Sequence, residues 1–410
     1  FKQKTAYEIM PSLVGSEMCI RDRLSGVKVL DISQGVAGPY AAKLLGGMGA
    51  DVISVEPPIH GDYARLTPPF FEDDPHLEKS GLFLYLNTDK RSITLDLSSE
   101  QAQSVMKPLI EWADIIIENY APDTLENLGL SYKDIEKISR KTTLVSITEF
   151  GQSGPYKDYQ GTNLISLALG GLLQITGDVD KEPLKVGGRP AEYIAGLSAF
   201  SGAMIALYAQ RASGEGQHVD VSMVEAIATA QMYSGLNYAY LGENRVRAND
   251  IAPMYQVSNG HVGVMYRQGN WDDFCDMIGR PEMKDDERFI DNVARRENII
   301  ELNQIVSEWM IKQDKTELYH LAQGQRMPFG YICDAEDLIS SEQYIHRGYF
   351  VEIDHPVCGK LLYPGHSFFW DGEKLPMERA PLLGEHNESI YEALGFSKEE
   401  LSALTEKGVI

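Results

Sequence analysis

Short apolar runs alternate with amphipathic segments along the first third of the chain. The apolar runs have the length and β-branched content of buried strands, and they cover residues 27–33, 51–57, 92–97, 114–120 and 143–151. Helical patterns lie between them at residues 38–50 and 98–113, and Ser98 with Gln101 suggests a capping box for the second. Strands alternating with helices predict an α/β fold with a mostly parallel sheet covered on both faces.

The pattern becomes helical beyond residue 160. We expect a helix near Asn163, a longer one near Pro190, and a short strand at 218–223. A linker-like segment at 244–253 then leads into a second region of mixed strands and helices. The resulting domain prediction is a large domain (24–243), a smaller α+β domain (244–345) and a return to the large domain (346–410).

The first 23 residues show no such patterning. Their charges lie at both ends, and the apolar part is interrupted by Pro11, Gly15 and Ser16, which does not match a signal peptide. The stretch AYEIMPSLVGSEMCIRDR resembles a translated sequencing adapter. We therefore predict that residues 1–23 are a non-native leader that contributes nothing to the fold.

Charge and cysteine content narrow the possible partners. The net charge of −23 on 410 residues argues against nucleic acid or an anionic membrane as the main partner. Residues 193–210 carry no charge but are rich in Gly, Ser and Ala, so we expect a buried helix rather than a membrane span. Four cysteines without a CxxC spacing argue against a disulfide framework or a metal site and favour the cytoplasm.

Individual motifs leave alternatives open. No G-x-G-x-x-G follows the first strand, which argues against a dinucleotide site even though Glu56 ends the second strand. Asn119 and Tyr120 follow a buried strand, where they could line a ligand site or form a turn. Glu192 follows Pro190, so it could be a catalyst or an acid that stabilises a helix start.

Taken together, several stretches resemble the class III CoA-transferase family. They include LSGVKVLDISQGVAGPYAAKLLGGMGADVISVEPP, ADIIIENYAPDTLENLGL, SGEGQHVDVSMVEA and the ending RAPLLGEHNESIYEALGFSKEELSALTEKGVI. The resemblance covers residues 24–410. It implies a Rossmann-like large domain built from both ends of the chain, a smaller domain between them, and an interlocked homodimer.

The resemblance also implies a site for coenzyme A thioesters, with no permanently bound cofactor and no metal. The expected CoA-binding residues are Val36, Ala37, Leu95, Asp96, Leu97, Asn119 and Tyr120. Counting back from Gly196 and Gly202 places Glu192 at the position of the family's nucleophilic aspartate.

Several residues depart from the family pattern. Pro57 and Asn127 stand where formyl-CoA transferase has basic residues, so Lys90, Arg91 or other cations would have to meet the CoA phosphates. Thr162 stands where the racemase branch needs a histidine. No GGGG run is present to supply oxyanion donors, and Gly269 is a substitute candidate.

The resemblance as a whole implies an enzyme that moves CoA from an acyl-CoA to a free carboxylic acid. The expected route passes through acyl-enzyme and enzyme–CoA intermediates on a carboxylate. The alternatives are a racemase or lyase acting on CoA esters, or a CoA-ester binding protein that has lost catalysis.

Overall fold

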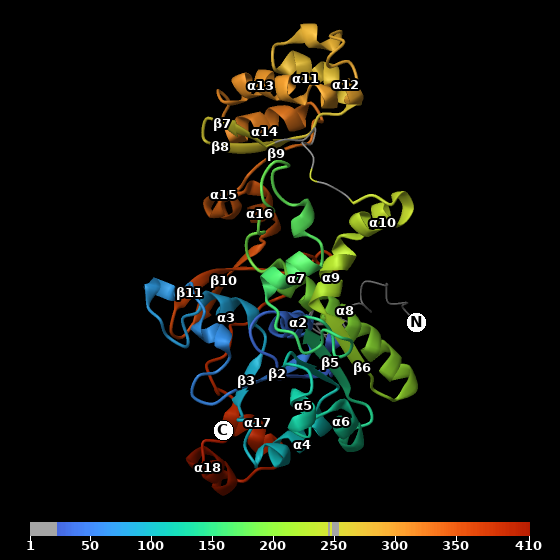
Figure 1. Ribbon diagram of the computed structural model, residues 1–410. Helices are drawn as coiled ribbons and strands as arrows, with labels where there is room; N and C mark the ends of the chain where they lie inside the picture. Colours follow the sequence, from blue (N-terminus) through green and yellow to red (C-terminus); the bar gives the residue numbers. More distant parts are fainter. Residues whose placement is uncertain (1–22, 245–246, 248–253) are drawn as a thin grey trace, which may run out of the picture. The chain divides into compact units, whose positions relative to one another are not determined.

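The computed structural model describes residues 23–244, 247 and 254–410. They form two compact units (Figure 1). The large unit contains the described residues up to Leu173, then Lys185–Asn244 and Gly348–Ile410. The second unit contains Gln174–Leu184 and the described part of residues 245–347. The segment Gln174–Leu184 thus groups with the second unit, whereas the sequence analysis assigns it to the large domain.

The large unit is built on a six-stranded parallel sheet in the order β3-β2-β1-β4-β5-β6. The strands are β1 (Lys28–Asp31), β2 (Asp51–Glu56), β3 (Arg91–Thr94), β4 (Ile115–Glu118), β5 (Thr143–Thr148) and β6 (His218–Ser222). Strands β4 and β5 are buried along their whole length, as expected for a sheet covered on both faces. The predicted α/β class is therefore confirmed.

Helices cover the two faces of this sheet (Figure 1). Those of the large unit are α2 (Ala37–Gly47), α3 (Gly81–Leu86), α4 (Ala102–Trp112), α5 (Thr124–Asn127), α6 (Tyr132–Ile138), α7 (Asn163–Leu169), α8 (Pro190–Ser213), α9 (Met223–Ala230), α10 (Met232–Leu241), α17 (Asn387–Ala393) and α18 (Lys398–Glu406). Ile116 of β4 faces a core shared with α4, α6, α17 and α18, and its neighbours Ile115 and Ile117 face a core shared with α2 and α8. Because side chains alternate along a strand, both faces of β4 are covered by apolar cores.

The capping box proposed for Ser98 and Gln101 is wrong. Helix α4 begins at Ala102, and no side chain caps its first turn. The Ser98 hydroxyl instead donates a hydrogen bond to Asp96 Oδ1 at 2.6 Å, which closes a local turn after β3. Serine and aspartate form such turns readily, and this turn delays the start of the helix.

The end of the chain returns to the outer strand β3. The Tyr391 hydroxyl of α17 donates to the Thr94 carbonyl oxygen at 2.8 Å, and the Ser92 N–H donates to His386 Nδ1 at 3.2 Å. A hairpin of β10 (Phe350–His355) and β11 (Gly359–Pro364) precedes this return and packs against Phe83 and Leu84 of α3. Residues 348–410 therefore complete the large unit.

Helix α8 has a buried face and an exposed one. Ala195, Ala199 and Ala203 are buried in the core that α8 shares with α2 and the sheet. Ile205 and Tyr208, in contrast, are 71% and 81% exposed. By length and composition alone α8 is also apolar enough to cross a membrane.

The second unit is an α+β fold with its own core. Its antiparallel sheet contains β7 (Met254–Val257), β8 (Gly260–Val264) and β9 (Phe329–Tyr331). Its helices are α11 (Trp271–Met277), α12 (Asn292–Glu297), α13 (Ile299–Met310), α14 (Lys315–Gly324), α15 (Ala335–Ser340) and α16 (Glu342–Arg347). Trp271, Phe274 and Phe329 lie in the core between the sheet and the helices.

The predicted leader lies almost wholly outside the described residues. Its last residue, Arg23, is described, and its guanidinium pairs with Asp371 at 3.0 Å and stacks over Trp370. Residue 23 therefore contacts the fold, although an exposed ion pair of this kind contributes little stability.

Candidate active site

A cavity of 340 Å³ opens at the carboxyl ends of β1, β4 and β5. It is lined by Gln34, Val36, Ala37, Tyr63, Asn119, Tyr120, Ala121, Glu149, Glu192 and Met223. Strands β1 and β4 are neighbours in the sheet. The strand that follows β1 in the chain, β2, lies on one side of this pair, and the strand that follows β4, β5, lies on the other. This is the topological switch point, where open α/β sheets bind their ligands.

Asn119 ties two of the contributing loops together. Its Nδ2 donates to the Gln34 carbonyl oxygen at 2.7 Å, and its Oδ1 accepts from the Gln34 N–H at 2.8 Å. This pair of bonds holds the loop in which Val36 caps α2 and Ala37 begins it. The N–H groups of the first turn have no partner within a helix, so they can meet an anionic group in the cavity. Asn119 thus acts as a positioning residue, and its predicted contact with CoA stays a prediction.

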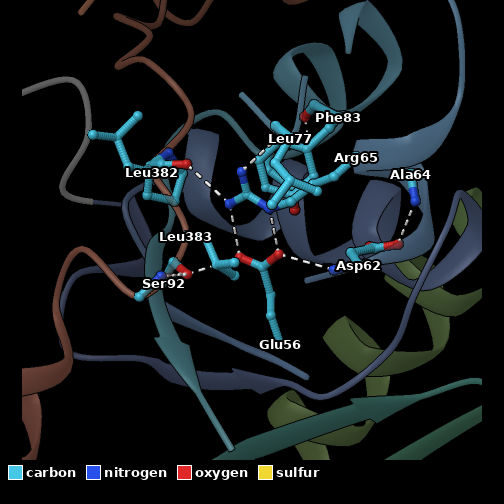
Figure 2. A network of polar contacts seen from close by, with 12 residues as sticks. Glu56, Asp62, Ala64, Arg65, Leu77, Phe83, Ser92, Leu382 and Leu383 are labelled. Carbon is cyan, nitrogen blue, oxygen red and sulfur yellow. Dashed lines mark hydrogen bonds and ion pairs between the residues drawn. The ribbon is translucent and has the colours of Figure 1, made fainter. Parts of the chain in front are cut away.

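A buried ion pair supports the other side of this loop. Arg65 donates from Nε and Nη2 to the two oxygens of Glu56 at 2.6 and 2.9 Å (Figure 2). The Asp62 N–H donates to Glu56 Oε2 at 3.0 Å, which fixes Asp62 under the loop. The Ser92 hydroxyl also donates to Glu56, so both oxygens of this carboxylate accept hydrogen bonds from within the protein. Glu56 is therefore not placed to bind a nucleotide ribose.

Asp62 and Tyr63 connect the buried ion pair to the cavity. The Asp62 carboxylate accepts from the Gly35 N–H at 2.8 Å, and burial raises its pKa to about 7. Tyr63 lies so close to Gly35 that a Cβ added there would be 1.7 Å from the tyrosine hydroxyl oxygen. Gly35 also has φ +80°, a left-handed conformation that favours glycine. A larger residue at position 35 would displace Tyr63 from the cavity wall.

Glycine also brings α8 into contact with α2. A Cβ added to Gly196 would lie 2.6 Å from the Ala37 carbonyl oxygen, so the two helix backbones touch at this point. Glu192 is four residues earlier, on the same face of α8, and is thereby placed beside the start of α2. Asn163 Oδ1 accepts from the Ala191 N–H at 3.0 Å and serves as a cap for this first turn.

Glu192 is held in a partly desolvated, polar environment. Its side chain is 14% exposed, and Arg189 Nη1 lies 3.3 and 3.4 Å from its two oxygens. Burial raises the pKa of Glu192, and the Arg189 guanidinium opposes that rise. Glu149, which lines the same cavity, adds to the rise.

A second cavity of 450 Å³ meets the first at Glu192. The two cavities share Tyr63, Glu149, Glu192 and Met223. The second one is further lined by Gly161, Thr162, Asn163, Leu164, Lys185, Gly188 and Arg189. Glu192 thus lies between one cavity at the sheet's switch point and another on the side of α7.

The structure brings five of the eight predicted site residues into one cavity, namely Val36, Ala37, Asn119, Tyr120 and Glu192. Leu95, Asp96 and Leu97 do not line it. The Leu95 side chain is buried in the core between the sheet and α4, and Asp96 accepts from Ser98. Their predicted contact with CoA stays a prediction, and the buried Leu95 side chain could contribute only through its backbone.

The cations proposed for the CoA phosphates are already engaged. The Lys90 ammonium is buried and bonded to Asp31 at 2.8 Å, to the Pro39 carbonyl oxygen and to Asn87, so the idea that it meets CoA is wrong. Arg91 is half-exposed and pairs with both oxygens of Asp51. Gly269 lies in the second unit, and its role as an oxyanion donor stays a prediction.

Several residues of the cavities escaped the sequence analysis, and those with polar or charged side chains that bear on the chemistry include Tyr63, Glu149, Lys185 and Arg189. Tyr63 reaches the site from the start of a short 3-10 helix (Tyr63–Leu66) after β2, and nothing in its local sequence marks that placement. Arg189 carried a usable signal, since it stands three residues before Glu192 and precedes a proline at a helix start. Among the described residues, no group of three or more His, Cys, Asp and Glu side chains is arranged to hold a metal ion.

Comparison with known proteins agrees with the family resemblance found in the sequence. Residues 24–387 match the family model described as CoA-transferase family III. The chain is 32% identical to a succinate–glutarate CoA-transferase of Agrobacterium fabrum, over 90% of this chain and 95% of the relative. It is 29% identical to a formyl-CoA:oxalate CoA-transferase of Streptomyces coelicolor, over 94% of this chain and 99% of the relative.

Solved structures agree with the family match. A CAIB/BAIF family protein from Brucella suis superposes with a TM-score of 0.83 at 28% identity, covering 91% of this chain and 99% of that one. A Mycobacterium tuberculosis protein gives 0.78 at 24% identity, over 90% of this chain and 98% of that one, and supports the fold alone.

Proposed function

Since this chain belongs to CoA-transferase family III and moves CoA between an acyl-CoA and a carboxylic acid, we propose that Glu192 is the carboxylate on which the transfer takes place. The acids named for its relatives range from oxalate to glutarate, so family membership leaves the acid open.

The proposed reaction starts with attack of a Glu192 oxygen on the thioester carbonyl carbon. The carbon–sulfur bond breaks, CoA leaves as a thiolate, and a mixed anhydride forms on Glu192. The thiolate then attacks the carbonyl carbon of Glu192, which releases the donor acid and leaves an enzyme–CoA thioester. The acceptor carboxylate repeats these two steps in reverse order and leaves with CoA, so charge and protons balance.

The single observation that carries this proposal is the placement of Glu192. Its carboxylate lines the cavity at the switch point of the sheet, beside the start of α2. Contact between Gly196 and Ala37 fixes this position from the α8 side. A glutamate is longer than the family's aspartate by about 1.5 Å. Arg189, which holds both oxygens of Glu192, offers a way to fix the direction of the longer side chain.

Glu192→Gln tests the proposal because it keeps the shape and removes the nucleophilic charge. We expect transfer to fall by at least about 10³-fold, with thioester binding retained. Borohydride added during turnover should reduce the enzyme–CoA thioester to an alcohol on residue 192, detected by peptide mass spectrometry. Glu225→Gln is the matched control, since Glu225 is an exposed acid in the first turn of α9 and should not affect turnover.

The same experiment distinguishes the alternatives. An adduct on Glu149 would assign the nucleophile to the other carboxylate that lines the cavity. Thioester binding without any turnover would favour a binding protein that has lost catalysis. Exchange of the α-proton of the thioester would favour a racemase, for which Thr162, at the cap of α7, offers no base.

We further propose that the enzyme works as a homodimer in the cytoplasm. Support for the dimer comes from the exposed apolar side chains on one face of α8, among them Leu197, Ile205 and Tyr208. Monomers seldom leave such a stripe uncovered.

A further inference from the structure

The two cavities that meet at Glu192 differ in charge. The residues that line only the first cavity, such as Gln34 and Asn119, include no lysine or arginine. The second cavity is lined by two cations, Lys185 and Arg189. In a chain with a net charge of −23, a pair of cations beside the reacting carboxylate points to an anionic ligand.

Both cations have hydrogen-bonding capacity to spare. Arg189 contacts Glu192 through Nη1 alone, at 3.3 and 3.4 Å, and its side chain is 39% exposed. Among the described residues, no hydrogen bond engages its Nε or Nη2, and no ion pair engages the exposed Lys185 ammonium. An arginine with two free nitrogens can still bind a carboxylate in a forked geometry.

The chemistry of the reaction strengthens this inference. In the proposed intermediates Glu192 is an anhydride or a thioester, so its negative charge disappears. Arg189 would then be a half-buried cation whose remaining acidic neighbour in the cavity is Glu149. A second carboxylate on the acyl group would replace the lost charge and stabilise each intermediate.

We propose, on the basis of the function proposed above, that the second cavity selects short dicarboxylic acids. The reacting carboxyl group meets Glu192, and the distal carboxylate binds Arg189 and Lys185. Reacting atoms lie about 3 Å apart and an arginine–carboxylate bond is about 2.8 Å long. Because Arg189 Nη1 lies only 3.3 Å from Glu192, a diacid with two or three methylene groups, joined by bonds of about 1.5 Å, is long enough to reach both residues.

The test compares acceptors of equal length that differ only in the second carboxylate. Succinate is compared with butyrate, and glutarate with valerate, with both succinyl-CoA and butyryl-CoA as donors. The wild-type enzyme should favour the diacid in kcat/KM by at least about 10-fold, since a hydrogen-bonded charged group is lost with the monoacid. Equal or better turnover of the monoacids would overturn the proposal.

Substitutions then assign the preference to residues. Arg189→Gln should reduce the diacid-to-monoacid ratio by about 10- to 100-fold, Lys185→Gln should reduce it by a smaller factor, and Arg189→Lys should restore part of it. Arg211→Gln is the control, because Arg211 is an exposed arginine in the last turn of the same helix. A ratio left unchanged by Arg189→Gln, with both acids slowed equally, would show a general role for this arginine and refute the selection.

Failure of the two proposals can be told apart. If no acid of either kind accepts CoA and no adduct forms on Glu192, the proposed function fails. If monoacids accept CoA through Glu192 as well as diacids do, the function stands and the selection fails. If Arg189→Gln does not fold, the diacid-to-monoacid ratio of the wild-type enzyme and of Lys185→Gln still tests the selection.

Discussion

At the scale of single residues, two buried carboxyl groups directly precede cavity residues in the chain: Asp62 precedes Tyr63, and Glu118 precedes Asn119. Glu118, the last residue of β4, is 3% exposed, and its Oε2 accepts from the Tyr120 N–H at 2.8 Å. Burial raises the pKa of Glu118 to about 7, and hydrogen bonds from Ser146 and Tyr120 only partly oppose this rise. Asp62, with its pKa also near 7, supports the neighbouring loop.

This arrangement predicts a pH dependence of stability. Because the folded pKa of Glu118 exceeds its ordinary value of 4.5, its contribution to stability is full below pH 4.5 and is lost as the pH rises through 7. Glu118→Gln should reduce that loss by about 1–3 kcal/mol between pH 4.5 and 7.5. Unfolding midpoints of variant and wild type across this range measure the difference.

The exposed Glu100 provides the control, since Glu100→Gln should leave the pH profile of the wild type unchanged. All other titratable groups are common to both proteins and cancel in the comparison. Parallel profiles for Glu118→Gln and wild type would show that folding does not raise the pKa of this carboxyl group.

At the scale of elements, the contact of α8 with α2 places the candidate nucleophile. Gly196→Ala would put a Cβ 2.6 Å from the Ala37 carbonyl oxygen, so α8 must move away from α2. We expect kcat/KM to fall by about 10- to 100-fold, because a displacement of about 1 Å at the reacting group is costly. The variant should also unfold at lower temperature, by the equivalent of about 1–3 kcal/mol.

Gly235→Ala in α10 is the matched substitution, since no atom lies within 4 Å of the added Cβ. It should leave activity unchanged and keep or raise stability. If both glycine variants behaved alike, close packing of α8 against α2 would not be what positions Glu192.

Sequence patterns predicted the elements better than they predicted their contacts. Continuous apolar runs such as 114–120 mark buried strands whatever lies beside them, and Pro190 marks the start of α8. The Ser98 capping box failed because a nearer partner, Asp96, competes for the hydroxyl. Bonds between distant segments, such as Asn119 with Gln34, leave no local signal, so the positioning role of Asn119 was not predictable.

At the scale of the whole molecule, the proposed homodimer makes a direct prediction. Light scattering at micromolar concentration should give twice the chain mass of 45.7 kDa. Ile205→Glu combined with Tyr208→Glu should shift the mass toward one chain, because both side chains are exposed on α8. Ile300→Glu, at a residue 81% exposed in the second unit, is the control. A wild-type enzyme active at the mass of one chain would refute the dimer.

The return of the chain end to β3 has a consequence for folding during synthesis. Strand β3 is bonded to residues near 386–391, about three hundred positions later in the chain. A nascent chain that has already exposed the whole second unit still lacks the helices that cover one end of its parallel sheet. Contacts of such long range slow folding and leave apolar strands uncovered in the meantime. The ribosome must therefore release almost the entire polypeptide before the catalytic unit can close, and this interval is when the chain most needs a chaperone.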